Sequence, residues 1–157
     1  MPKAMRIGTG AGFAGDRLEP AAALVARGKL DALVFECLAE RTIALAHRRR
    51  RADPGAGFDP LLERRLCPVL PGVAAQGIRV LTNMGAADPE GAGRRAAALC
   101  RELGVKLRIG VVTGDDVLDR IDPAAPALED GRPLASHGTL IAANAYLGAD
   151  AMLPALE

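Results

Sequence analysis

Short apolar runs and longer amphipathic segments alternate along the first two thirds of the chain. The apolar runs are rich in Ile, Val, Leu and Phe and predict β-strands at about residues 5–8, 31–35, 78–82 and 107–112. The segments between and beside them predict helices at about residues 19–28, 38–50, 59–75 and 89–103. This alternation is typical of βαβ units, so we predict an α/β fold whose mostly parallel sheet is flanked by helices.

Proline and glycine positions refine these elements. Pro68 and Pro71 lie inside the 59–75 segment and predict that it forms two short helices. Asp88 and Pro89 suit the N-cap and the first position of the helix that follows them. Glycines placed just past three helices predict left-handed ends at Gly28, Gly77 and Gly104.

A small polar or glycine-rich cluster follows each predicted strand. In parallel sheets, ligands bind beyond the carboxyl ends of the strands, so we expect the strand-end loops to form a cleft. The candidate substrate-binding residues in these clusters are Gly10, Gly12, Asp16, Arg17, Glu40, Arg41, Thr42, Asn83 and Gly85. The candidate catalytic residues are Glu36, Asp115 and Asp116. We expect Gly10, Gly12, Asp16, Glu36, Asn83 and Asp115 to converge on one edge of the sheet.

Several of these side chains have both a chemical and a structural interpretation. Glu36 can serve as a general base or a metal ligand, and Arg41 can clamp a carboxylate or phosphate. Glu40 equally suits the positive end of a helix, with Arg41 as its solvated neighbour. Asn83 can bind a carbonyl or carboxylate while Gly85 lets backbone come close, or both can simply belong to a turn.

Asp115 and Asp116 form a pair of adjacent carboxylates that Mg²⁺ could use. The pattern Thr113-x-x-Asp116 suits helix capping equally well. The sequence leaves the metal unknown.

The pattern Gly10-x-Gly12-x-x-Gly15, with Glu36 about twenty residues further on, matches the spacing of a dinucleotide fingerprint. Against that interpretation, Pro20 delays the helix and Asp16 would place a negative charge near the phosphates. The alternatives are a loop that closely approaches another ligand and a plain turn.

Composition narrows the class of protein. The 157 residues are 50% hydrophobic and 25% charged, with a net charge of +1, as in a globular domain without an electrostatic footprint for nucleic acid or an anionic membrane. No apolar run reaches the roughly 18 residues of a membrane span, and the start does not resemble a signal peptide, so we expect a cytoplasmic protein. The three cysteines have no Cys-x-x-Cys spacing, which argues against a zinc knuckle or a disulfide framework.

The final segment, residues 139–156, is rich in small and apolar residues. We expect it to be covered by a partner, either in a homo-oligomer or by a second subunit, and Asn144 is a further candidate ligand contact near the cleft.

Five ordered blocks resemble the acyclic terpene utilisation (AtuA) family. They are Gly10-Ala11-Gly12-Phe13-Ala14-Gly15-Asp16-Arg17, Leu33-Val34-Phe35-Glu36-Cys37-Leu38-Ala39-Glu40-Arg41-Thr42, Thr82-Asn83-Met84-Gly85-Ala86-Ala87, Gly114-Asp115-Asp116-Val117-Leu118 and Ala143-Asn144-Ala145-Tyr146-Leu147-Gly148-Ala149. The resemblance extends over essentially the whole chain. It implies that residues 1–157 form a single α/β domain equivalent to the N-terminal part of a longer family architecture, as a truncated or split form would.

The resemblance also implies a role in the bacterial catabolism of acyclic isoprenoids such as citronellol and geraniol. We expect the domain to bind an acyl-CoA or carboxylate metabolite for a lyase or hydratase step, with a CoA thioester as substrate and Mg²⁺ as a candidate cofactor. The alternative is a non-catalytic subunit that assembles with a second polypeptide.

Overall fold

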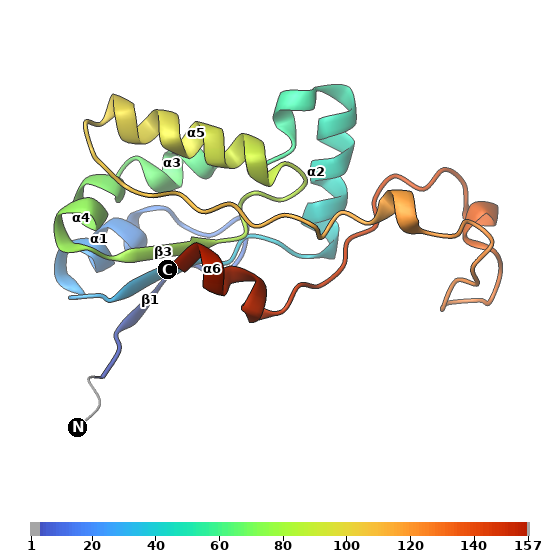
Figure 1. The fold of residues 1–157 in the computed structure, drawn as a ribbon, viewed down its shortest axis with the longest axis horizontal. Coiled ribbons are helices and arrows are strands. Elements are labelled where there is room, and N and C mark those ends of the chain that lie inside the picture. The colour runs from blue at the N-terminus through green and yellow to red at the C-terminus, as the bar shows by residue number, and fades with distance from the viewer. Residues whose placement is uncertain (1–3, 157) are drawn as a thin grey trace. The chain divides into compact units, whose positions relative to one another are not determined.

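A computed structural model describes residues 4–156 of the chain (Figure 1). The chain divides into two compact units, with the division between Val111 and Val112. The first unit holds the sheet and the longer helices. The second contains short helical turns and extended segments.

Three parallel strands form the sheet of the first unit. They are β1 (Ile7–Ala11), β2 (Ala32–Phe35) and β3 (Arg79–Thr82), in the order β1-β2-β3. Gly8 lies opposite Leu33, which lies opposite Val80, and the register shifts once between Thr9 and Ala11. The parallel pairing confirms the α/β prediction.

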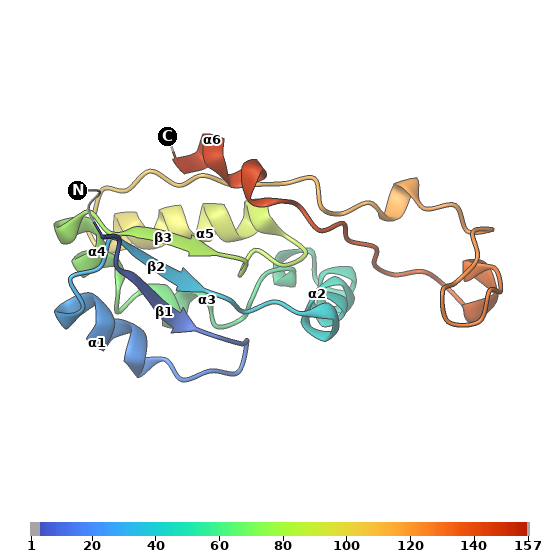
Figure 2. The ribbon, with the colours of Figure 1, turned by 90° about the horizontal axis from the view of Figure 1, so that it is seen from below.

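The helices of the first unit follow the predicted order. They are α1 (Glu19–Arg27), α2 (Glu40–Ala52), the 3₁₀ turn η1 (Pro54–Ala56), α3 (Leu62–Leu66), α4 (Leu70–Gln76) and α5 (Pro89–Glu102). The split of the 59–75 segment into α3 and α4 confirms the prediction made from its prolines. In both views α3, α4 and α5 lie on the same side of the sheet, and α1 packs against β1 (Figures 1 and 2). No helix within residues 4–156 has the length and hydropathy needed to cross a membrane.

The core lies between the sheet and these helices. Leu33 and Phe35 of β2 are almost fully buried together with Val73 of α4 and Leu99 of α5. A Cβ atom on Gly10 would stand 2.5 Å from Cε1 of Phe35, so the missing side chain makes room for this ring. Burial of such aliphatic and aromatic side chains is the main favourable contribution to folding.

Three of the four predicted helix caps are confirmed. The Asp88 side chain accepts the Gly91 N–H at 2.8 Å, with Pro89 as the first residue of α5. Gly77 and Gly104 both have φ of 67°, as predicted. The prediction for Gly28 is wrong: its φ is −76°, and the chain turns left-handed one residue later, at Lys29.

The predicted strand at 107–112 is absent. Val105 and Leu107 pack against the core, and the Val105 N–H donates to the Cys100 carbonyl at the end of α5. Further along, Val111 lies close to Gly93 of α5: a Cβ atom added to Gly93 would stand 2.5 Å from Cγ2 of Val111. The alternating apolar side chains of this segment therefore pack beside α5 and form no strand ladder with β3.

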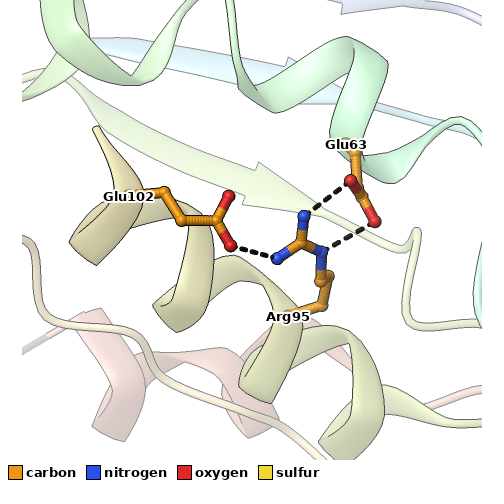
Figure 3. A network of polar contacts seen from close by, with 3 residues as sticks. All are labelled: Glu63, Arg95 and Glu102. Atoms are coloured by element: carbon orange, nitrogen blue, oxygen red, sulfur yellow. Dashed lines mark hydrogen bonds and ion pairs between the residues drawn. The ribbon is translucent and has the colours of Figure 1, made fainter.

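An arginine ties α3 to α5 (Figure 3). Arg95 binds Glu63 through two parallel hydrogen bonds of 2.7 Å and Glu102 through a third of 2.7 Å. The hydrogen bond from Arg95 lowers the pKa of Glu63, and the hydrogen bonds to Glu63 and Glu102 raise the pKa of Arg95. The paired geometry of a guanidinium and a carboxylate makes this a specific link between two helices.

The second unit is built from turns. Its helical elements are η2 (Leu118–Arg120), η3 (Leu134–His137), η4 (Ala149–Met152) and α6 (Leu153–Leu156). Two isolated antiparallel bridges close it, between Asp116 and Asn144 and between Pro126 and Pro133.

Candidate binding site at the strand ends

The loop after β1 is closed by its own aspartate. The Asp16 carboxylate accepts the N–H groups of Gly12 at 2.9 Å and of Arg17 at 2.8 Å. These hydrogen bonds lower the pKa of Asp16 and hold it ionised. Because Asp16 occupies the Gly12 amide, that amide is not available to a phosphate, and the loop does not fit a dinucleotide site.

A buried arginine donates hydrogen bonds to the backbone of the same loop. Arg65 of α3 is only 1% exposed, and its Nη2 donates to the carbonyl oxygens of Ala14 at 2.9 Å and Asp16 at 3.1 Å. Its Nε and Nη1 have no hydrogen-bond partner among the described residues. The guanidinium thus fixes the backbone that presents Asp16 and Arg17.

Asn83 joins the ends of β2 and β3. Its Oδ1 accepts the backbone N–H of Cys37 at 2.7 Å, and its Nδ2 donates to Oε1 of Glu36 at 3.0 Å. Oε1 of Glu36 also accepts the Leu38 N–H at 2.9 Å. Glu36 and Asn83 therefore lie on the same edge of the sheet, as predicted, and Glu36 remains exposed there.

Thr42 caps the start of α2, the helix that follows β2 in the chain. Oγ1 of Thr42 accepts the Ala39 N–H at 2.6 Å and donates to the Ala39 carbonyl at 2.9 Å, so Thr42 caps the helix that begins at Glu40. Arg41 is exposed in the first turn of this helix. Glu40 lies in the first turn, where a negative charge suits the helix dipole.

Two of the glycines in the predicted site have packing roles. Gly10 accommodates the Phe35 ring, and a Cβ on Gly85 would stand 2.8 Å from Cα of Pro89 at the start of α5. Gly12 is not tightly packed in this way, because the atom nearest to an added Cβ would be Oδ2 of Asp16 at 3.8 Å. Close packing inside the fold thus accounts for Gly10 and Gly85.

A pocket of about 140 Å³ lies behind the strand ends, between the β1 loop, the start of α2 and the connector before α3. Its wall includes Cys37, Thr42, Arg49 and Asp59 together with aliphatic side chains. Burial raises the pKa of the Cys37 thiol to about 11, so this group is a neutral thiol near pH 7 and a poor nucleophile.

Asp115, Asp116 and Asn144 all belong to the second unit. Nδ2 of Asn144 donates to Oδ2 of Asp115 at 2.9 Å, and Oδ1 of Asp116 accepts the Leu118 N–H at 3.3 Å. Their place at the strand-end site stays a prediction. Within residues 4–156, no group of three or more His, Cys, Asp or Glu side chains is arranged to hold a metal ion.

Sequence reasoning missed Arg65 and Asp59. Arg65 lies in a short helix without a motif, and its burial depends on how α3 packs under the β1 loop. Asp59 is part of the turn-rich connector that ends at Pro60, and such a context indicates only a turn. A buried charge cannot be recognised in either pattern.

A family model described as "Acyclic terpene utilisation family protein AtuA" matches residues 5–157. No curated protein matches the chain, and no solved structure does.

Proposed function

Because the chain belongs to the acyclic terpene utilisation family AtuA, we propose that the edge formed by the ends of β1, β2 and β3 binds the carbonyl end of a branched acyl metabolite. The metabolite is an acyl-CoA thioester or the corresponding carboxylate. The observation that carries this proposal is the Glu36–Asn83 pair, which presents a carboxylate and an amide side by side at the carboxyl ends of two parallel strands.

The amide of Asn83 supplies a hydrogen-bond donor. One N–H of Nδ2 is directed to Glu36, which leaves the second for a substrate carbonyl oxygen. Arg17 is exposed on the loop after β1, and Arg41 is exposed in the first turn of α2. Both can pair with a carboxylate or with the phosphates of CoA. Gly12 lies on the loop that Asp16 closes, and Thr42 caps the helix that begins at Glu40.

Glu36 is the acid–base group of the proposed site. For a hydratase step on a conjugated thioester, its oxygen Oε2 takes a proton from the water whose oxygen adds to the β-carbon, and then gives that proton to the α-carbon of the resulting enolate. The lyase direction runs the same two proton transfers in reverse. The thioester carbonyl, held by Asn83, takes up the charge that develops during addition.

Calorimetric titration tests the binding step. The probes are 3-methylbut-2-enoyl-CoA, 3-methylbut-2-enoate and CoA alone, added to the wild-type chain and to Glu36→Gln and Asn83→Ala variants. We expect the thioester or the acid to bind the wild type and to lose about tenfold or more in affinity in both variants. Gln76→Ala is the matched control, because it removes an amide that donates to the Val25 carbonyl at the opposite end of β3. Equal affinity in all variants, or no binding of any probe, would overturn the proposal.

A second candidate function is that of a non-catalytic subunit. Large apolar side chains are exposed in the second unit, among them Tyr146 at 90%, Leu153 at 55% and Leu147 at 45%. Such exposure favours assembly with a second copy or another polypeptide. Light scattering at micromolar concentration checks this: a dimer or larger species supports assembly, and a stable monomer that binds its ligand opposes it.

A further inference from the structure

The segment that follows α5 is extended, but it has no partner strand. It runs back beside the helix, and Val111 lies against Gly93 of α5 (Figures 1 and 2). The backbone N–H and C=O groups of Leu107, Ile109 and Gly110 make no hydrogen bond within residues 4–156. Because these are strong hydrogen-bonding groups, the segment is an open edge on which another strand can pair.

An open groove of about 580 Å³ lies between this segment and the C-terminal part of α5. Its wall combines apolar and basic side chains and has no acidic one. The apolar residues are Ala97, Cys100, Val105, Leu107 and Ile109, and the basic residues are Arg101, Lys106 and Arg108. All of them belong to the first unit, and Ile109 is 39% exposed. The groove therefore suits a ligand that is partly apolar and negatively charged.

The side chains of the segment alternate between two environments. Leu107 packs against the core and Val111 against α5, whereas Lys106 and Arg108 are exposed. A strand that pairs with this edge has one row of side chains on the α5 side and the other row on the side of the two cations. Aliphatic side chains suit the first row, and acidic side chains suit the second.

The same features argue against two other occupants. A second copy that pairs symmetrically through this edge would bring Lys106 and Arg108 of both copies together, and like charges on neighbouring strands are destabilising. A fatty acid would cover the apolar wall, but it would leave the backbone groups of Leu107 and Ile109 without partners.

We propose that the groove beside α5 is a docking site for an extended segment of another polypeptide, which has alternating aliphatic and acidic side chains and adds as a strand to residues 106–111. Main-chain hydrogen bonds contribute affinity, and the two rows of side chains contribute specificity. The inference goes beyond the function proposed above, because no residue of the groove belongs to the strand-end site. It also differs from the second candidate function, which rests on the second unit.

The test compares two peptides that differ only in charge, Ac-Val-Glu-Leu-Glu-Val-NH₂ and Ac-Val-Lys-Leu-Lys-Val-NH₂. Each is added to the ¹⁵N-labelled full chain, and the backbone amide signals of Leu107, Ile109 and Gly110 report binding. We expect the acidic peptide to bind about tenfold or more tightly than the basic one and to lose affinity when salt is raised. The acidic peptide with methylated backbone nitrogens should bind more weakly, because it cannot donate to the edge.

Lys106→Glu should reduce the preference for the acidic peptide, because it reverses one of the charges beside the edge. Lys29→Glu is the matched control, since Lys29 is an exposed lysine just after α1, as Lys106 is just after α5. It should leave the preference unchanged. Glu36→Gln should also leave peptide binding unchanged even where it weakens thioester binding, which separates this inference from the proposed function.

Equal affinity for the two peptides, or no binding of the acidic peptide at millimolar concentration, would overturn the inference. Decanoate is a further probe, and its binding in the groove without binding of either peptide would assign the groove to an acyl chain and overturn the inference as well. An unchanged preference in a folded Lys106→Glu variant would do the same. If that variant does not fold, the comparison of the two peptides on the wild-type chain decides alone.

Discussion

Asn83 accepts the backbone N–H of Cys37 at 2.7 Å, and this bond joins the ends of two neighbouring parallel strands. The same side chain donates to Glu36 from its other terminal atom. A single amide therefore sets the spacing of β2 and β3 at their carboxyl ends and also orients the carboxylate of the proposed site. Structural and functional roles coincide in this residue, and substitutions must be chosen to separate them.

Asn83→Ala should lower the free energy of unfolding by about 1–3 kcal/mol, because the partly buried Cys37 N–H loses its acceptor. Chemical denaturation with urea measures this. Glu36→Gln should cost much less, since a glutamine oxygen can still accept from Leu38 and Asn83. Equal stability of Asn83→Ala and the wild type would show that the Cys37 contact contributes nothing.

Asn83→Asp should make stability depend on pH. The introduced carboxylate keeps an acceptor for Cys37 but stands beside Glu36, and the two like charges raise the pKa of the pair in the folded state. A folded pKa above the unfolded value means that stability is fully present at low pH and is lost as the pH rises through the raised pKa. Thermal melting between pH 4 and pH 8 should therefore show a fall relative to the wild type, and a parallel pH profile for the two proteins would contradict the Glu36 contact.

The Arg95 link predicts the opposite pH dependence. Hydrogen bonding from Arg95 lowers the pKa of Glu63 below its ordinary 4.5, so its stabilising effect is present above about that pH and is lost as the pH falls through the lowered value. Glu63→Gln should therefore have a lower melting temperature than the wild type at pH 7, and the difference should shrink in acid. Arg95→Lys should also melt lower at pH 7, because lysine cannot form the paired contact. A difference that is constant down to pH 2 would contradict this account.

Gly10→Ala tests whether the glycine pattern serves packing. The added Cβ meets the Phe35 ring, so we expect a loss of about 1–3 kcal/mol in the free energy of unfolding. Adding Phe35→Leu should recover part of that loss, because the smaller side chain frees the space. Gly12→Ala is the control and should cost less, since the nearest atom to its Cβ position is 3.8 Å away. Equal losses at Gly10 and Gly12 would contradict a packing role specific to Gly10.

Cys37 should resist alkylation. With a pKa raised to about 11 by burial, its thiol should react with iodoacetamide far more slowly at pH 7.5 than the half-buried Cys67. Peptide mass spectrometry of briefly treated protein gives the order of labelling, and the same treatment in urea should label both cysteines alike. Rapid labelling of Cys37 in the folded chain would show that the pocket wall is open or activated.

The sequence predicted the parts of the fold that depend on local signals. Strands β1, β2 and β3, the proline-directed split between α3 and α4, and the Asp88 cap all follow from periodicity and turn chemistry. The strand at 107–112 failed because alternation alone does not say whether apolar side chains will face a sheet or a helix such as α5. For the site, parallel topology brought Glu36 and Asn83 together as predicted. The buried groups Arg65 and Asp59 could not be foreseen, because their burial depends on packing between distant elements.

The side-chain amide signal of Asn83 gives the most direct test of the proposed binding site. In a ¹⁵N-labelled chain titrated with 3-methylbut-2-enoyl-CoA, this NH₂ pair should shift and saturate as its second proton bonds the thioester carbonyl. The NH₂ pair of Gln76, at the opposite end of β3, should stay in place. An Asn83 signal that remains unmoved at a saturating concentration of the thioester would contradict the account.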